Sequence, residues 1–182
     1  MKHKQLYLLV VYILSLGLLT ACSNDEDNSP NQTDINSGSH SYYISLDNGE
    51  EFQGSVPKYT GDIFYYSAFV EYNEDTNRDN LSILLYETGI FNLSIVLELD
   101  EDNQPNPESI FAGISFNEWN AEKIYTSIQY TATLDNYQEQ TVNHYGEDAK
   151  IAAFTLHFEG TFSNTLNNEI VSGSGTIIIA AP

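Results

Sequence analysis

Hydrophobic and polar residues alternate along most of the chain between residues 41 and 182. In IFNLSIVLEL, residues 90–99, the apolar side chains at Phe91, Leu93, Ile95 and Leu97 share one face. Successive side chains of a strand point to opposite sides of a sheet, so this pattern predicts a strand with one buried face. The same reasoning predicts strands at 41–46, 51–56, 63–72, 81–87, 90–99, 124–134, 150–163 and 170–181.

The inward residues of two long strands follow from the same alternation. The apolar face of 150–163 consists of Ala152, Phe154, Leu156, Phe158 and Phe162. The apolar face of 124–134 is predicted to contain Ile124, Ile128, Tyr130, Ala132 and Leu134. No segment shows a convincing helical stripe, and residues 117–123 are predicted to form one helical turn at most.

A polar face opposite an apolar face is typical of antiparallel sheets. Asn48-Gly49 lies between two predicted strands and is a strong hairpin signal. We therefore predict an all-β fold, an antiparallel β-sandwich or flattened barrel of about eight or nine strands. It forms a single β-domain over residues 41–182. Periodicity does not distinguish the sandwich from the barrel.

The first 21 residues differ from the rest of the chain. Lys2 and Lys4 precede an unbroken run, residues 6–19, that is almost entirely apolar. A helix needs about 20 apolar residues to cross a bilayer, so this run is short for a permanent anchor. A basic start, a short apolar run and small residues after it predict a secretory signal peptide at 1–21.

Leu19, Thr20, Ala21 and Cys22 resemble the bacterial lipobox, the recognition sequence of the lipoprotein signal peptidase. The resemblance implies cleavage between Ala21 and Cys22 and attachment of lipid to Cys22. Cys22 is also the only cysteine, so it cannot form an internal disulfide in an exported protein. Two or more acyl chains anchor a protein stably, whereas one does not, so the multiply acylated lipid that the lipobox resemblance implies would hold this protein at a membrane.

Residues 22–40 lack periodicity and are rich in Ser, Asn and Asp, which is typical of a flexible tether. Near its start, Asp25, Glu26 and Asp27 resemble the acidic export signal of Bacteroidota surface lipoproteins. That resemblance implies an outer membrane lipoprotein facing the cell exterior. The alternative is that these acids only keep the tether solvated.

The whole layout resembles a group of uncharacterised Bacteroidota surface lipoproteins with a lipobox, an acidic tether and one β-rich domain. In the domain, the resemblance lies in the last hairpin, residues 158–162 and 171–175. No activity follows from it.

The balance of charge excludes some partners. The chain has 6 Lys and Arg against 26 Asp and Glu, a formal net charge of −20. Binding to nucleic acid through phosphate neutralisation needs a basic patch, so no nucleic-acid partner is expected. For the same reason, the folded domain is not expected to bind an anionic membrane surface.

The sequence nominates no catalytic residue and no cofactor or cofactor-binding residue, because phosphate loops, nucleophile elbows and zinc-protease motifs are missing from it. His157 and Glu159, two apart on one strand face, could form a pair of base and orienting carboxylate. The alternative, which we favour, is a solvated strand face.

Asp75, Asn77 and Asp79 are the candidate metal ligands, since oxygen-bearing side chains at alternate positions resemble the start of a calcium loop. The loop departs from that pattern, with Asn80 in place of the glycine and Tyr86 in place of the closing glutamate. A solvated hairpin loop is the favoured interpretation.

We therefore expect a lipid-anchored, surface-exposed cell-envelope protein with a non-catalytic binding or scaffolding β-domain. One alternative is a calcium- or glycan-binding module of a nutrient-uptake system. In Tyr42-Tyr43 and Tyr65-Tyr66, adjacent rings point to opposite faces, so one of each pair is a candidate for stacking on a sugar. Another alternative is a hydrolase with an unrecognised carboxylate site. The sequence names neither the glycan nor the envelope protein that would be the partner.

Overall fold

The computed structural model describes residues 38–58, 67–106, 109, 112–119, 123–144 and 146–181. The predicted signal peptide, the lipidation site Cys22, the acids at 25–27 and the Tyr65-Tyr66 pair lie outside these ranges. All the described residues belong to one compact unit.

The described residues form nine β-strands and no helix, and all strand pairings are antiparallel, which confirms the predicted fold class. The strands are β1 (Ser39–Leu46), β2 (Glu51–Pro57), β3 (Ala68–Asn73), β4 (Arg78–Glu87), β5 (Phe91–Glu98), β6 (Gly113–Glu118), β7 (Tyr125–His144), β8 (Glu147–Asn164) and β9 (Ile170–Ile179).

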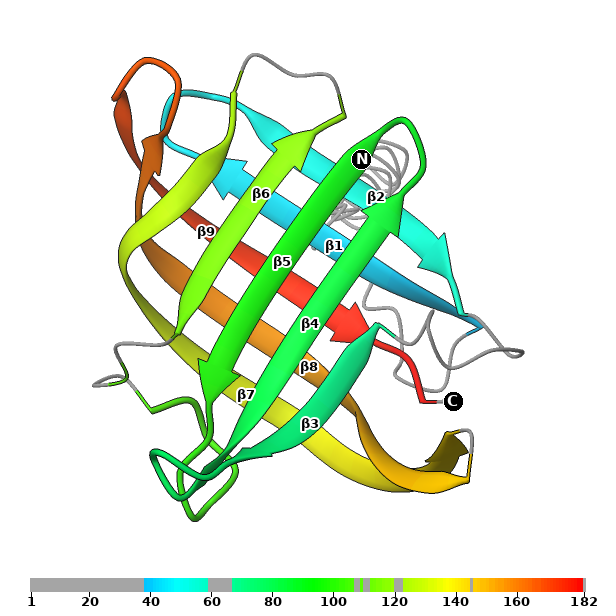
Figure 1. The fold of residues 1–182 in the computed structure, drawn as a ribbon. Helices are drawn as coiled ribbons and strands as arrows, with labels where there is room; N and C mark the ends of the chain where they lie inside the picture. The colour runs from blue at the N-terminus through cyan, green and yellow to red at the C-terminus, as the bar shows by residue number, and fades with distance from the viewer. Residues whose placement is uncertain are drawn as a thin grey trace, which may run out of the picture. The chain divides into compact units, whose positions relative to one another are not determined.

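The sheet closes on itself through the long strand β8. The strand order is β2-β1-β9-β8-β3-β4-β5-β6-β7, and β8 also pairs with β7. Near its start β8 pairs with β3, at Lys150 and Ile151, and from Phe154 onward it pairs with β9. Figure 1 shows the result as two crossing layers. We call β3–β6 the front layer and β2, β1, β9, β8 and β7 the back layer.

The core lies between the two layers and consists of the inward faces of the strands. The alternation predicted for residues 90–99 is confirmed, because Phe91, Leu93, Ile95 and Leu97 are at most 1% exposed. The inward residues of β8 meet them from the back layer, and Phe158 and Phe162 pack edge to face. Full burial of one such side chain contributes about 1.5–3 kcal/mol, so the shared core dominates the stability of both layers.

The predicted face of 124–134 is wrong at its start. Ile128 is 57% exposed and Ile124 36% exposed, whereas Tyr125 is completely buried. The β7–β8 register is irregular between Ser127 and Gln129. A bulge adds a residue to one strand, so the inward and outward positions of that strand exchange beyond it. Tyr125 therefore points inward on one side of the bulge, and Tyr130 on the other.

Two boundaries also need correction. In the segment 117–123, where the sequence predicts one helical turn at most, Asn117 and Glu118 instead end strand β6. At the other end of the domain, β1 begins at Ser39, so the last two residues of the predicted tether belong to a strand. His40 is buried there, and its Nδ1 atom accepts a hydrogen bond of 3.0 Å from the backbone N–H of Ala180.

Candidate functional site

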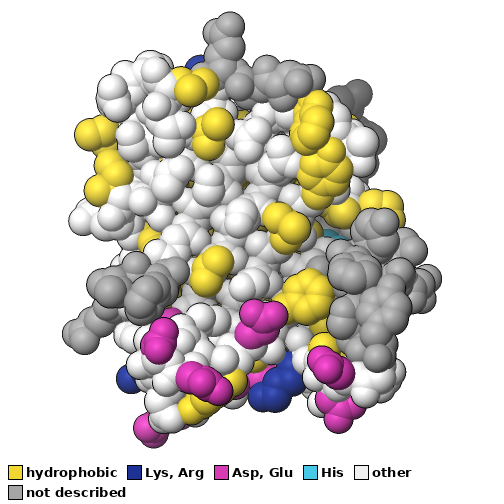
Figure 2. All heavy atoms as spheres, in the orientation of Figure 1, with side chains coloured by type: hydrophobic (Ala, Val, Ile, Leu, Met, Phe, Trp, Pro, Cys, Tyr) yellow, Lys and Arg dark blue, Asp and Glu magenta, His cyan; other side chains and the backbone are white. Residues whose placement is uncertain are grey.

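The outward side of the front layer bears a patch without charged side chains. We call it the neutral face, and its outward residues on β4, β5, β6 and the following turn are Ser82, Leu84, Tyr86, Asn92, Ser94, Val96, Ser115, Asn117 and Trp119. Cross-strand register places them in rows, one of which joins Tyr86, Asn92 and Asn117. Figure 2 shows the acidic side chains of this side gathered at its lower end, away from its centre.

Two aromatic rings stand at the upper end of the neutral face. Tyr86 and Trp119 are 44% and 42% exposed, and their rings meet edge to face with centroids 5.4 Å apart. The backbone N–H of Trp119 donates a 2.7 Å hydrogen bond to the carbonyl oxygen of Ile90, in the β4–β5 turn. This bond and the ring contact hold the indole in place while leaving much of its surface open.

Two amide side chains lie beside the rings in the same row. Asn117 donates a 2.7 Å hydrogen bond to the carbonyl oxygen of Glu118, which leaves its Oδ1 atom as an acceptor. Within the described ranges, the Asn92 side chain forms no hydrogen bond. The two acids that follow Tyr86 and Asn117 in the chain, Glu87 and Glu118, are in register with the buried Phe91 and so point to the other side of the sheet. The face therefore offers uncharged donors, acceptors and ring surface together.

Sequence reasoning missed Tyr86 and Trp119 as candidate site residues. One signal was available, because Trp119 is the only tryptophan of the chain and follows a short segment with buried Ile114 and Phe116. Of the tyrosines that the sequence nominated, Tyr42 and Tyr43 point to opposite faces of β1. Tyr42 is buried in the core, and Tyr43 points outward, where its hydroxyl donates to Glu51 Oε1 at 3.2 Å.

The back layer carries a second polar cluster on its outward side. His157 Nδ1 lies 3.0 Å from Thr176 Oγ1, and His157 Nε2 lies 3.5 Å from Asp135 Oδ2. The partners of His157 are therefore on the two neighbouring strands, and the contacts do not involve Glu159, the predicted partner. Glu159 is instead in register with Thr131 and Ser174.

A carboxylate, an imidazole and a hydroxyl in series have the composition of a nucleophilic triad. A triad for acyl transfer also needs free N–H donors for the developing oxyanion. Thr176 lies in β9, which pairs with β1 at Tyr43 and with β8 at His157. Its strand is therefore paired on both sides, so the backbone N–H groups beside Thr176 are engaged in the sheet. With His157 and Asp135 45% and 62% exposed, the cluster is a solvated surface contact rather than a catalytic site.

A hollow of about 520 Å³ lies beside the same strands. It is lined by Gln129, Tyr130 and Thr131 of β7, Glu159 and Gly160 of β8, and Gly173 of β9. Among the described residues that line it, Glu159 is the one carboxylate, so these residues include no pair of acids for general acid–base chemistry.

The candidate metal ligands lie in the β3–β4 hairpin, where two of them have other partners. Asn77 has a left-handed backbone with φ of 55°, and its Oδ1 atom accepts a hydrogen bond from the Tyr72 hydroxyl. Asp79 Oδ2 lies 3.4 Å from Lys150 Nζ. Among the described residues, no three or more His, Cys, Asp or Glu side chains form a group suited to a metal ion.

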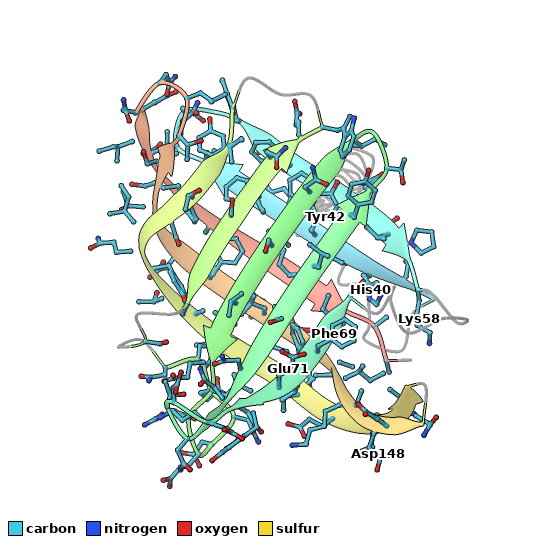
Figure 3. All side chains as sticks on the ribbon, in the orientation of Figure 1. His40, Tyr42, Lys58, Phe69, Glu71 and Asp148 are labelled. Carbon is cyan, nitrogen blue, oxygen red and sulfur yellow. The ribbon has the colours of Figure 1, made fainter. Side chains whose placement is uncertain are left out.

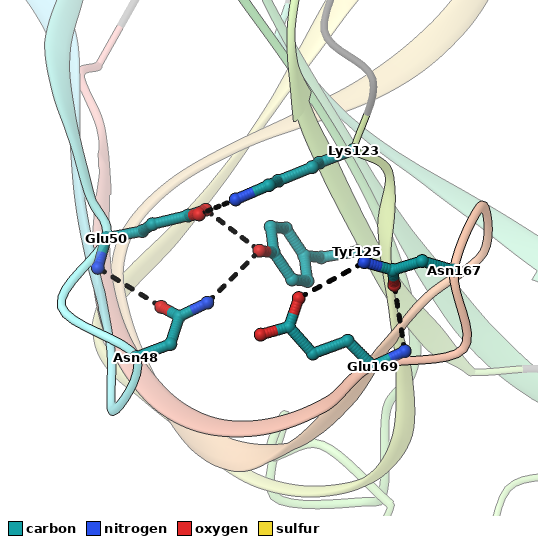
Figure 4. A network of polar contacts seen from close by, with 6 residues as sticks. All are labelled: Asn48, Glu50, Lys123, Tyr125, Asn167 and Glu169. Carbon is teal, nitrogen blue, oxygen red and sulfur yellow. Dashed lines mark hydrogen bonds and ion pairs between the residues drawn. The ribbon is translucent and has the colours of Figure 1, made fainter.

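A polar network within the back layer joins the β1–β2 turn to the start of β7, as Figure 4 shows. Glu50, just before β2, accepts hydrogen bonds from Lys123 and, at 2.8 Å, from the hydroxyl of Tyr125. Burial opposes ionisation of Glu50, but the bonds from Lys123 and Tyr125 outweigh it and lower the pKa of the carboxyl. The carboxylate thus ties the β1–β2 turn to the start of β7, which indicates a structural role.

A contact between the two layers involves Tyr42 of β1 and Glu87 of β4. The Tyr42 hydroxyl donates a 2.6 Å hydrogen bond to Glu87 Oε2, and its ring stacks on Phe91 with centroids 4.2 Å apart. Burial, followed by the bond to Glu87, raises the pKa of Tyr42, so the phenol remains a donor. A Cβ atom at Gly54 would lie 2.5 Å from this hydroxyl, so the contact requires glycine there.

Comparison with known proteins identifies no matching family model, no matching curated protein and no matching solved structure. Within the ranges that the structure describes, no helix has the length and hydropathy that a bilayer span requires.

Proposed function

We propose that this chain is a lipid-anchored protein of the outer membrane, exposed on the cell exterior, whose β-domain binds an uncharged partner without catalysing a reaction. The observation that supports binding is the neutral face. A protein with a formal net charge of −20 presents, on one layer, an outward surface of serines, asparagines and two exposed rings. Exposed aromatic residues beside polar groups are a mark of recognition surfaces.

The anchoring part of the proposal rests on residues 19–27 of the sequence. Cys22→Ala should abolish lipid labelling and membrane fractionation. Replacing Asp25, Glu26 and Asp27 with alanine should retain the lipid but remove protease accessibility on whole cells. Unchanged labelling of the first variant would contradict anchoring, and full surface exposure of the second would leave the acids a solvating role only.

The binding part can be tested by hydroxyl-radical footprinting of the full chain, on whole cells and after purification. If a partner covers the neutral face, Trp119 and Tyr86 should be labelled several-fold less on cells. Tyr72, which is 59% exposed on β3, is the internal reference and should be labelled equally in both samples. Equal labelling of Trp119 in the two samples would contradict the proposal.

A further inference from the structure

We propose that the partner of the neutral face is a neutral oligosaccharide, with Tyr86 and Trp119 as its stacking platform and Asn92 and Asn117 as its hydroxyl-binding groups. This inference rests on the proposed function and specifies the ligand class of the same surface. It is carried by the ring pair, the adjacent amides and the position of the charges.

The ring pair fits the apolar side of a sugar. One face of a pyranose ring presents C–H groups, which pack on an aromatic surface, while its hydroxyls point sideways. The 5.4 Å contact between Tyr86 and Trp119 fixes the two rings edge to face, so little side-chain entropy remains to be lost on binding. Aromatic rings that are already held by the protein are effective anchors for this reason.

The amides fit the hydroxyls. A sugar hydroxyl both donates and accepts a hydrogen bond, and an asparagine side chain offers a carbonyl acceptor and two N–H donors. Asn92 is directly in register with Tyr86 on one side and Asn117 on the other. Neighbouring strands are about 4.8 Å apart, so the row spans about 10 Å, the length scale of a short oligosaccharide.

The charges argue against an ionic ligand. The acids of this side gather at the end where β4 begins, as Figures 2 and 3 show for the region around Glu71. An anionic ligand would be repelled by a protein of net charge −20. A cationic ligand would find no carboxylate among the outward residues of the neutral face. An uncharged ligand is the class that this surface accommodates.

The composition of the centre argues against a protein partner. A standard protein interface buries about 800 Å² on each partner, and its centre is apolar. The middle rows of the neutral face instead place Ser94 and Ser115 beside Leu84 in register across three strands. Small hydroxyl side chains leave a flat, hydrogen-bonding strip, which suits an extended sugar chain better than an interlocking protein surface.

The only tryptophan of the chain lies in the platform and serves as the probe. The purified full chain is titrated with linear neutral hexasaccharides of glucose, xylose and mannose, and Trp119 emission and its quenching by acrylamide are recorded. At least one hexasaccharide should shift the emission to shorter wavelength and reduce quenching at least two-fold, in a saturable manner. Polygalacturonate, the charged comparison, should leave both signals unchanged.

Variants then locate the site. Tyr86→Ala and, separately, Asn92→Ser should weaken the binding of that hexasaccharide at least ten-fold. Tyr72→Ala is the matched control and should bind like the unmodified chain. Each variant's melting temperature identifies any loss that comes from unfolding. Absence of a response to every hexasaccharide, an equal response to polygalacturonate, or undiminished binding by both site variants would overturn the inference.

The outcomes separate this inference from the proposed function. Protection of Trp119 on cells without hexasaccharide binding would support the proposed function and overturn the sugar as ligand. Absence of both protection and binding would overturn both.

Discussion

The outward sides of the two layers cover the same core, yet they present different chemistry. The front layer exposes the uncharged neutral face with a rigid pair of rings, Tyr86 and Trp119. The back layer exposes threonines and serines around an ionisable cluster, Asp135, His157 and Thr176. A surface that must remain solvated gains from charge, since charge keeps a protein soluble and repels unintended partners. The missing charge on the neutral face is therefore the more informative feature.

The two sides also differ in how their polar groups are used. On the back layer both ring nitrogens of His157 already contact neighbouring side chains. On the front layer Asn92 makes no side-chain bond within the described residues, and Asn117 keeps an acceptor. Unused donors and acceptors beside exposed rings are what a ligand requires. This contrast supports the proposal that recognition belongs to the neutral face of the front layer.

The largest expected effects test whether both layers depend on one core. Phe158→Ala in the back layer should cost about 3–5 kcal/mol of unfolding free energy, and Leu93→Ala in the front layer about 2–5 kcal/mol. Both side chains are buried. Thr133→Ala, on the outward side of β7, is the control and should change stability by no more than about 0.5 kcal/mol. Chemical denaturation measures all three, and a cost for Thr133→Ala equal to the others would contradict the one-core description.

A second effect compares the buried histidine with the exposed one. Burial, with a further contribution from the positive charge of Lys58, lowers the pKa of His40 to about 4. Figure 3 shows the two side chains near each other. In the unfolded chain the pKa returns to about 6.5, so between pH 6.5 and 4 the unfolded state binds more protons. The His40 contribution is therefore fully present above pH 6.5 and is lost as the pH falls, by as much as about 3 kcal/mol.

His40→Asn tests this pH dependence, because Oδ1 of asparagine can replace Nδ1 as the acceptor for Ala180. The variant should lose less stability than the unmodified chain between pH 6.5 and 4. His157→Gln replaces the exposed histidine and is the variant against which the effect of His40→Asn is compared. All three proteins have the same carboxylates. Subtracting one denaturation series from another therefore removes the contribution of the carboxylates to the pH dependence of stability. Parallel curves for His40→Asn and the unmodified chain would contradict the assignment.

A smaller effect concerns the ring pair of the neutral face. A double-mutant cycle of Tyr86→Ala and Trp119→Ala should give a coupling energy of about 0.5–1.5 kcal/mol, as expected for an edge-to-face aromatic pair. Both single variants should remain folded because both rings are exposed. A coupling of zero, measured by thermal or chemical unfolding, would mean that the platform is not pre-formed.

The smallest effect belongs to the back layer. Asp135→Asn should change stability by less than about 1 kcal/mol, because Asp135 and His157 meet where both side chains are exposed to solvent. The small difference should decrease further in high salt. A larger loss that salt does not reduce would indicate that the cluster has a structural role, and would weaken the contrast between the two sides.

The strands with one buried face were predictable from sequence because burial on one side imposes a period of two. The alternation at 90–99 and 150–163 identified the buried residues of β5 and β8, and Asn48-Gly49 marked the first hairpin, where Gly49 has a φ of 87°. The long β7–β8 extension was not recognised beyond residue 134. Residues 135–144 and 147–150 are mostly polar, so cross-strand pairing holds them as strands and no hydrophobic period reveals them.

The sequence by itself determined the all-β class, most of the core and the excess of negative charge, because each of these depends on residue type and local spacing. Only the tertiary structure decided that Ile128 points outward, that His40 is buried and that His157 contacts Asp135. It also decided the neutral face. Tyr86 and Trp119 are 33 positions apart in the chain, and their rings meet because β4, β5 and β6 pair in one register. Register is a property of strand pairs, and no single segment contains it.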